Sequence, residues 1–306
     1  MGVLALLWGS TFLWIKLALG ALAPVQVTLT RCILGAAVLL ALCLRARHRL
    51  PHGRTIWRHI FVAAFFCNAL PFAMFSIGEK TVSSGLAGVL NATTPLWSVL
   101  IGLAIGTEHT LRPVRLAGLL LGFAGTVLIF APWAQTGPVG WSALAIIAAA
   151  ASYAVGFTYM ARHLIGKGIP TISLSAAQLI AAAGLTALTL PAGGLAAVHI
   201  SPKSLSAVVI LGIVATGITF HLTYRIIADE GATNAATVGY LLPVVSVALG
   251  AIFVNEALNL RIVAGMVVVL VGVGMTRRQQ RKPSAAAAEA LEAPHTAAAA
   301  ANTLRT

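Results

Sequence analysis

The sequence predicts an all-α membrane protein with ten transmembrane helices in two inverted five-helix repeats. Three observations predict this fold class: an apolar composition, ten apolar runs of membrane-spanning length, and a repeat that relates the two halves of the chain. Of the 306 residues, 59% are hydrophobic and 9% are charged, and the mean hydropathy is +0.94. Soluble domains carry about a quarter of charged residues. The composition therefore excludes an ordinary soluble domain and places the chain in a lipid bilayer.

The apolar runs are long enough to cross the hydrocarbon layer as helices. A helix rises about 1.5 Å per residue and needs about 20 residues to cross it. Cutting the chain at proline, glycine and charge gives ten candidate spans. They are residues 1–19, 25–44, 59–78, 84–105, 114–132, 141–161, 171–190, 205–225, 233–254 and 262–276. Met1 leads straight into apolar sequence without a basic segment, so we expect no signal peptide.

The basic residues predict the orientation in the membrane. The chain has 20 Lys and Arg against 7 Asp and Glu, a net charge of +13. With the amino terminus inside, most of the cations lie in cytoplasmic loops, and only Lys80, Lys203 and Arg261 lie outside. This bias predicts a multi-pass protein with both termini cytoplasmic. Because the cations sit in short turns, we expect the lipid bilayer as a partner and no nucleic acid.

A shift of 148 residues lays the fourth span on the ninth. Pro95 and Glu108 then match Pro243 and Glu256, and such residues rarely coincide between two apolar helices. The repeat unit is about five spans, and an odd number of spans turns the second copy upside down. The predicted units are 1–132 for the first repeat, 133–282 for the second, and 283–306 for a disordered, Ala-rich cytoplasmic tail. Inverted repeats are typical of alternating-access transporters.

Both repeat prolines fall near the middle of their spans. Proline lacks an amide donor and frees the carbonyl four residues earlier, here that of Asn91 or Gly239. A free carbonyl at this depth must meet protein or a wet cavity. Paired breaks at matching places therefore predict a substrate cavity. The alternative is a packing kink whose carbonyl bonds to a neighbouring Ser or Thr.

Residues spaced by three or four place polar and aromatic faces on several spans. Asn91 offers a donor and an acceptor, and Tyr240 offers a hydroxyl beside an aromatic ring, which suits a zwitterion with an apolar side chain. The alternatives are that these two bond neighbouring helices, that Thr219 bonds its own helical turn, and that the aromatic residues only pack. The candidate substrate-binding residues are Trp8, Thr11, Asn68, Phe72, Phe75, Asn91, Pro95, Ser98, Tyr153, Phe157, Thr219, Tyr240 and Pro243.

Two cations, Lys16 and Arg31, are the charges placed inside spans. Each lies within about two turns of the predicted outer end, so we expect the side chains to snorkel to the headgroups. A carboxylate-binding role is the alternative. All seven acidic residues fall at helix ends or in the tail. This distribution favours facilitated diffusion, or a coupling route that the sequence does not identify, over proton antiport through a mid-membrane carboxylate.

Catalytic and cofactor motifs are not found in the sequence. Cys32, Cys43 and Cys67 lie in apolar runs without metal-ligand spacing, so no disulfide, metal or cofactor is expected. The chain has no HExxH, GxSxG or P-loop motif, which argues against an enzyme and against an ATP-driven pump. A channel is disfavoured because the predicted midplane is mostly apolar. Small-residue pairs such as Gly118 and Gly122 predict close packing of neighbouring helices, and we expect a monomer.

Several short motifs resemble those of a known family. The first span carries Trp8, Gly9, Ser10, Phe12 and Lys16, followed by Pro24 and Arg31, and each half ends with Pro, Gly, Glu and a Gly-rich helix. In this the chain resembles the EamA-type branch of the drug/metabolite transporter superfamily over residues 1–276. The resemblance is strongest in 240–272 and weaker in the sixth span, where Ser152 and Tyr153 replace the Trp and Gly of the first.

The resemblance implies a ten-helix secondary carrier with a central cavity between its halves. Such carriers export amino acids, related metabolites or drugs across the bacterial cytoplasmic (inner) membrane, so the resemblance implies that location. An aromatic-amino-acid exporter is the member type we expect. A drug or multidrug efflux carrier is the alternative within the family. A membrane channel and a membrane-embedded enzyme are the alternatives from other classes.

Overall fold

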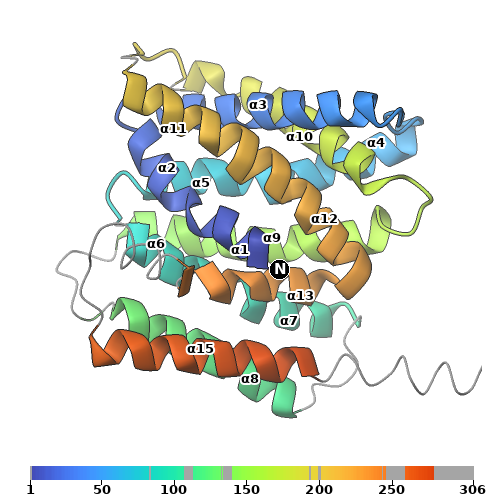
Figure 1. Cartoon of the computed structure of the whole chain (residues 1–306). Helices are drawn as coiled ribbons and strands as arrows, with labels where there is room; N and C mark the ends of the chain where they lie inside the picture. Colours follow the sequence, from blue (N-terminus) through green and yellow to red (C-terminus); the bar gives the residue numbers. More distant parts are fainter. Residues whose placement is uncertain are drawn as a thin grey trace, which may run out of the picture.

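The computed structural model describes residues 2–82, 84–106, 113–131, 133, 140–192, 194–198, 201–242, 244–245 and 259–278. Within these ranges the chain forms helices and no strands (Figure 1). The all-α class predicted from the composition is therefore confirmed for the described part. Pro243, most of the repeat motif after it, and the predicted tail at 283–306 lie outside the described residues.

Helices follow one another with short connections. The first half contains α1 (Gly2–Gly9), α2 (Thr11–Ala18), α3 (Pro24–Arg45), α4 (Arg54–Ala64), η1 (Phe65–Ala69), α5 (Leu70–Gly78), α6 (Ser84–Asn91), α7 (Thr94–Ala104) and α8 (Pro113–Phe130). The second half contains α9 (Trp141–His163), α10 (Thr171–Ala187), η3 (Leu190–Ala192), α11 (Pro202–Gly212), η4 (Ile213–Ile218), α12 (Thr219–Glu230), α13 (Ala232–Thr237), η5 (Val238–Tyr240) and α15 (Leu260–Arg278).

Within the described part of the chain, five helical segments are long and apolar enough to cross a membrane. They are Pro24–Arg45, Arg54–Gly78, Leu86–Ala104, Trp141–His163 and Pro202–Glu230. Four shorter apolar segments accompany them, at Gly2–Ala18, Pro113–Ile129, Thr171–Ala187 and Leu260–Thr276. Segments of this length and composition are those of a multi-pass membrane protein.

Two of the long helices contain a wide π turn at matching places. The π turns η1 and η4 begin at residues 65 and 213, 148 residues apart, which is the shift found in the sequence repeat. In η1, Pro71 supplies no amide donor to the turn before it, and the hydroxyl of Ser152 donates to the carbonyl of Phe66 at 2.7 Å. In η4, the hydroxyl of Thr216 donates to the carbonyl of Leu211 at 2.7 Å. Side-chain hydroxyls thus bond carbonyls at both π turns.

Two further helices are interrupted at corresponding places. Helix α6 ends at Asn91 and α7 begins at Thr94, so the predicted break before Pro95 is confirmed. In the second half α13 passes into the tighter 3₁₀ turn η5, and a shift of 148 lays residues 90–92 on η5. The two breaks are therefore matched in position.

Helices from equivalent places in the halves pack against each other. In Figure 1, α8 and α15 lie side by side at the lower edge, and α3 and α10 pack together toward the upper edge. A Cβ on Gly272 would lie 2.6 Å from the carbonyl oxygen of Gly118. A Cβ on Gly265 would lie 2.9 Å from the carbonyl oxygen of Gly125. The predicted close packing at small residues is confirmed, because only glycine permits this approach.

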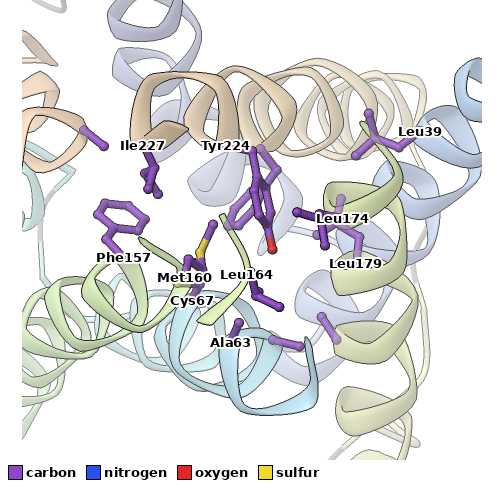
Figure 2. Close-up of a cluster of buried hydrophobic side chains, with 14 of the residues drawn as sticks. Leu39, Ala63, Cys67, Phe157, Met160, Leu164, Leu174, Leu179, Tyr224 and Ile227 are labelled. Atoms are coloured by element: carbon purple, nitrogen blue, oxygen red, sulfur yellow. Dashed lines mark hydrogen bonds between the residues drawn. The ribbon is translucent and has the colours of Figure 1, made fainter. Parts of the chain in front are cut away.

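The largest hydrophobic core joins the two halves. Figure 2 shows Tyr224 of α12 extending into a cluster that includes Leu39 of α3, Cys67 of η1, Met160 of α9 and Leu174 of α10. Each of these side chains is at most 1% exposed. The core therefore holds α3, α9, α10 and α12 in fixed positions beside the cavity described next.

Candidate functional site

A cavity lies between the two halves where several helices are interrupted. Its walls include the α1–α2 junction, the α6–α7 break and η5. Its free volume is about 40 Å³, enough for a few water molecules. The lining residues are Trp8, Thr11, Phe12, Ile15, Arg31, Phe75, Asn91, Thr94, Tyr153, Phe157, Ala236, Gly239 and Leu242.

Aromatic rings form a continuous wall of this cavity. Trp8 and Phe157 are stacked with centroids 6.1 Å apart at 12°. Phe12 and Phe75 are 5.7 Å apart, and Phe75 and Tyr153 are 6.1 Å apart. Ring pairs at these separations attract each other. The wall combines both halves and offers an apolar surface on which a flat or branched apolar group can lie.

Polar groups from the α6–α7 break lie on the cavity wall. The hydroxyl of Thr94 donates to the carbonyl of Asn91 at 2.7 Å, so the carbonyl freed by Pro95 is satisfied by a neighbouring threonine. The predicted alternative, in which a neighbouring threonine bonds the free carbonyl, is therefore correct for the hydrogen bond. The break itself still faces the cavity, because Asn91 and Thr94 line it. At the matching break, no heavy atom of the described residues beyond its own helical turn lies within 4 Å of the place where a Cβ on Gly239 would sit.

Arg31 is buried beside the cavity. It is 3% exposed, and its guanidinium carbon lies 3.7 Å from the centroid of the Phe72 ring. Its Nε donates to the hydroxyl oxygen of Thr216 at 3.0 Å. The expectation that Arg31 snorkels to the headgroups is wrong, because the ring and the hydroxyl hold the cation inside the protein. Lys16 is exposed, and its Nζ donates to the carbonyl of Glu79 at 2.8 Å.

Six of the predicted site residues are brought together here: Trp8, Thr11, Phe75, Asn91, Tyr153 and Phe157. Three others have partners inside the helix bundle. Asn68 accepts a hydrogen bond from Gln178 at 2.6 Å, and Phe72 lies under Arg31. The hydroxyl of Thr219 donates to the carbonyl of Ala215 at 2.8 Å, the self-bonded arrangement given as its alternative.

Tyr240 lies away from the cavity, contrary to the predicted helix face. Its ring packs directly against Gly122, where an added Cβ would lie only 2.8 Å from a ring carbon. Its hydroxyl has no hydrogen-bond partner among the described residues. The reason is the 3₁₀ turn, which has three residues per turn. Residues three apart, Ala236, Gly239 and Leu242, therefore share the cavity face. The prediction assumed the α-helical spacing.

Ser98 lines a second hollow, one turn farther along the same helices. This hollow has a volume of about 300 Å³, and its walls belong to α7, α9 and α13. The hydroxyls of Ser98 and Thr233 are 3.5 Å apart and join α7 to α13. Pro95 is buried in the first turn of α7 and is not among the described residues that line either space. The second repeat proline, Pro243, lies outside the described residues.

The candidate list lacks the other residues that line the cavity: Phe12, Ile15, Arg31, Thr94, Ala236, Gly239 and Leu242. Ile15 lies four residues after Thr11 and three after Phe12, so helical spacing brings it to the same side of α2 as both. Arg31 carried a usable signal, since a charge within a span is a functional candidate by default, and carboxylate binding was its stated alternative to snorkelling. Leu242 carried none, because its place depends on the 3₁₀ turn before it.

Comparisons with known proteins agree with this architecture. The profile of the EamA-like transporter family matches residues 1–131 and 140–278. The chain is 28% identical to the uncharacterized transporter YdfC of Bacillus subtilis, over 88% of this chain and 87% of that protein. It is 26% identical to the uncharacterized inner membrane transporter YedA of Escherichia coli K12, over 84% and 82%. A solved crystal structure with 24% identity superposes with a TM-score of 0.73, covering 91% of this chain and 96% of the other, and shows the fold.

Proposed function

We propose, from the premise that this chain belongs to the EamA-like transporter family, that it exports small amphipathic metabolites by alternating access. Amino acids with aromatic side chains are the first class to test. The observation that carries this proposal is the cavity between the halves, with an aromatic wall beside the amide of Asn91 and the guanidinium of Arg31. Such a lining suits a solute with one apolar end and one polar end.

The proposal includes ten membrane crossings in two five-helix repeats of opposite orientation, in the bacterial cytoplasmic membrane with both termini inside. The nine apolar helical segments found among the described residues, together with the predicted span at 233–254, supply the crossings. The matching π turns and helix breaks support the repeat. The bias of the basic residues supports the orientation.

The two hollow spaces support an alternating path. Thr94 and Ser98 are one turn apart on α7, and Phe157 and Ala161 are one turn apart on α9. Thr94 and Phe157 line the cavity, and Ser98 and Ala161 line the hollow near the predicted cytoplasmic side. The contact between Ser98 and Thr233 lies in the hollow. Rocking one half against the other would widen the narrow cavity toward one side while closing it on the other.

Counterflow in proteoliposomes tests the proposal. Proteoliposomes that contain the purified protein and are loaded with unlabelled phenylalanine should accumulate radiolabelled phenylalanine, tryptophan or leucine from outside. The uptake should saturate as at a single site. Asn91→Leu should raise the half-saturation concentration about tenfold, the effect of losing a buried polar contact to the solute. Ser206→Ala, an exposed hydroxyl on α11, is the control and should leave transport unchanged. Unsaturable flux, or counterflow equal in wild type and Asn91→Leu, would contradict the proposal.

A further inference from the structure

One hydrogen-bonded pair occurs twice in the fold, once in each half. Arg31 lies seven residues after the first residue of α3, and Gln178 lies seven residues after the first residue of α10. Their partners, Thr216 and Asn68, are 148 residues apart and lie in the matching π turns η4 and η1. Arg31 donates to Thr216 at 3.0 Å, and Gln178 donates to Asn68 at 2.6 Å. The two pairs are equivalent positions of the repeat.

The Gln178 pair shows what packing requires at this place. Gln178 is 0% exposed, and its side-chain oxygen accepts a hydrogen bond from the Tyr224 hydroxyl at 2.5 Å. The neutral amide of Gln178 thus joins α10 to η1 and α12, and both its nitrogen and its oxygen have a hydrogen-bond partner. Burial of a guanidinium costs far more than burial of an amide. A neutral side chain is therefore sufficient for this helix contact, and packing alone does not account for the charge of Arg31.

Arg31 differs from Gln178 by facing the cavity. Among the described residues, its hydrogen bond from Nε uses one of five N–H donors, so the two terminal amino groups hold four more. No aspartate or glutamate is among the described residues that line the cavity. Glu79, 0% exposed at the end of α5, attracts the guanidinium and offsets part of the cost of burying it.

We propose that Arg31 binds the carboxylate of the transported solute, and that the substrates are carboxylates with an aromatic or other apolar body. This inference rests on the proposed function, since it assigns the polar end of the same cavity. The planar guanidinium bonds a carboxylate through two parallel N–H groups. Phe72 covers one face of the guanidinium, and Thr216 fixes its Nε, so the group is held before the solute arrives. The apolar body then lies along the rings of Phe75, Tyr153 and Phe157.

Three ligands with the same phenylethyl body test the assignment without any mutation. Phenylalanine has both charges, phenylpropionate has the carboxylate alone, and phenethylamine has the amine alone. Each is used as a competitor of radiolabelled phenylalanine in counterflow with wild-type protein. We expect phenylpropionate to compete within a few-fold of phenylalanine and phenethylamine to compete at least tenfold more weakly.

Variants then assign the preference to Arg31. Arg31→Gln introduces the residue found at the equivalent place of the other half and should weaken phenylpropionate at least tenfold. Arg31→Lys keeps a point charge and should restore part of the loss. Lys16→Gln is the matched control, since it removes the exposed cation of a neighbouring helix and should change nothing. Glu79→Gln should keep the carboxylate preference, because the proposed ligand contact is with Arg31.

The outcomes separate this inference from the function on which it rests. Lack of saturable uptake of phenylalanine, tryptophan and leucine, together with lack of competition by all three phenylethyl ligands, would defeat the proposed function and the inference with it. Competition by phenethylamine but not by phenylpropionate would overturn the inference while leaving a carrier in place. An Arg31→Gln protein that is folded, by its thermal unfolding in detergent, and that keeps the wild-type preference for phenylpropionate would also overturn it.

Discussion

The two halves match each other where helices pack and differ where they face the cavity. In the α8–α15 contact, glycine meets glycine at both ends, Gly118 with Gly272 and Gly125 with Gly265. At the cavity, Arg31 of one half is equivalent to Gln178 of the other, which lies in the protein interior. A two-fold contact needs the same residues twice. A solute without two-fold symmetry needs its binding groups once, so we expect the residues that bind the solute to differ between the halves.

The largest expected effect comes from moving the charge to the other half. Gln178→Arg would place a guanidinium among the neutral partners Asn68 and Tyr224, and arginine keeps its charge in proteins. We expect a loss of more than about 3 kcal/mol in the free energy of unfolding. The measurement is the yield of monodisperse protein and its thermal unfolding in detergent. Arg31→Gln is the comparison and should be the more stable of the two; equal stability would show that the halves do not differ in their need for charge.

The symmetric contact is tested by matched glycine substitutions. A Cβ on Gly272 would lie 2.5 Å from the backbone nitrogen of Gly122, and one on Gly125 would lie 2.7 Å from that of Val269. Alanine at either place must separate α8 from α15, at a cost of about 1–3 kcal/mol. Similar losses are expected because the two glycines are equivalent in the repeat.

Gly274→Ala is the control for this pair, since in the described part of the chain no heavy atom outside its own helical turn lies within 4 Å of the Cβ position. It should be neutral or slightly stabilising, because alanine favours helix by up to about 1 kcal/mol over glycine. Thermal unfolding of the three variants is compared under one condition. If Gly274→Ala lowers the unfolding temperature as much as Gly272→Ala, close packing is not what holds this contact.

The sequence was sufficient to predict features that depend on local chemistry. The all-α class follows from composition, and the break before Pro95 follows from the missing amide of proline. Trp8, Asn91 and Tyr153 were selected on three different spans from their residue types and positions along each helix, and the structure brings them to one cavity. These inferences needed only the period of the helix and the residue types.

What the sequence did not predict depends on tertiary contacts or on a change of helix type. The direction of Arg31 is decided by Phe72 and Thr216, which lie far from it along the chain. The position of Tyr240 is decided by the 3₁₀ turn, which changes the spacing from four to three. The π turn at Ile213–Ile218 has no proline to mark it. Such local changes of helix type follow from packing more than from propensity.

The next largest loss of stability is expected at the hydrogen bonds of the neutral Gln178 amide. Tyr224→Phe removes the donor to Gln178 and leaves a buried amide oxygen without that partner, which should cost about 1–2 kcal/mol in unfolding free energy. Tyr240→Phe is the control, because its buried hydroxyl has no partner among the described residues, and it should be neutral or stabilising. Thermal unfolding checks both. A larger loss for Tyr240→Phe would show that the Gln178 network is not the stronger contact.

The smallest effect is expected at the hydroxyl that orients Arg31. Thr216→Val removes the acceptor of its Nε and should cost about 1 kcal/mol of stability. The loss of orientation should raise the half-saturation concentration for phenylalanine about threefold to tenfold. Thr219→Val is the control one turn away, because that hydroxyl bonds only carbonyls of its own helix, at 2.8 and 3.0 Å. Should both valines weaken transport alike, the change would come from helix packing around η4, and Thr216 would not be the group that holds the guanidinium for the solute.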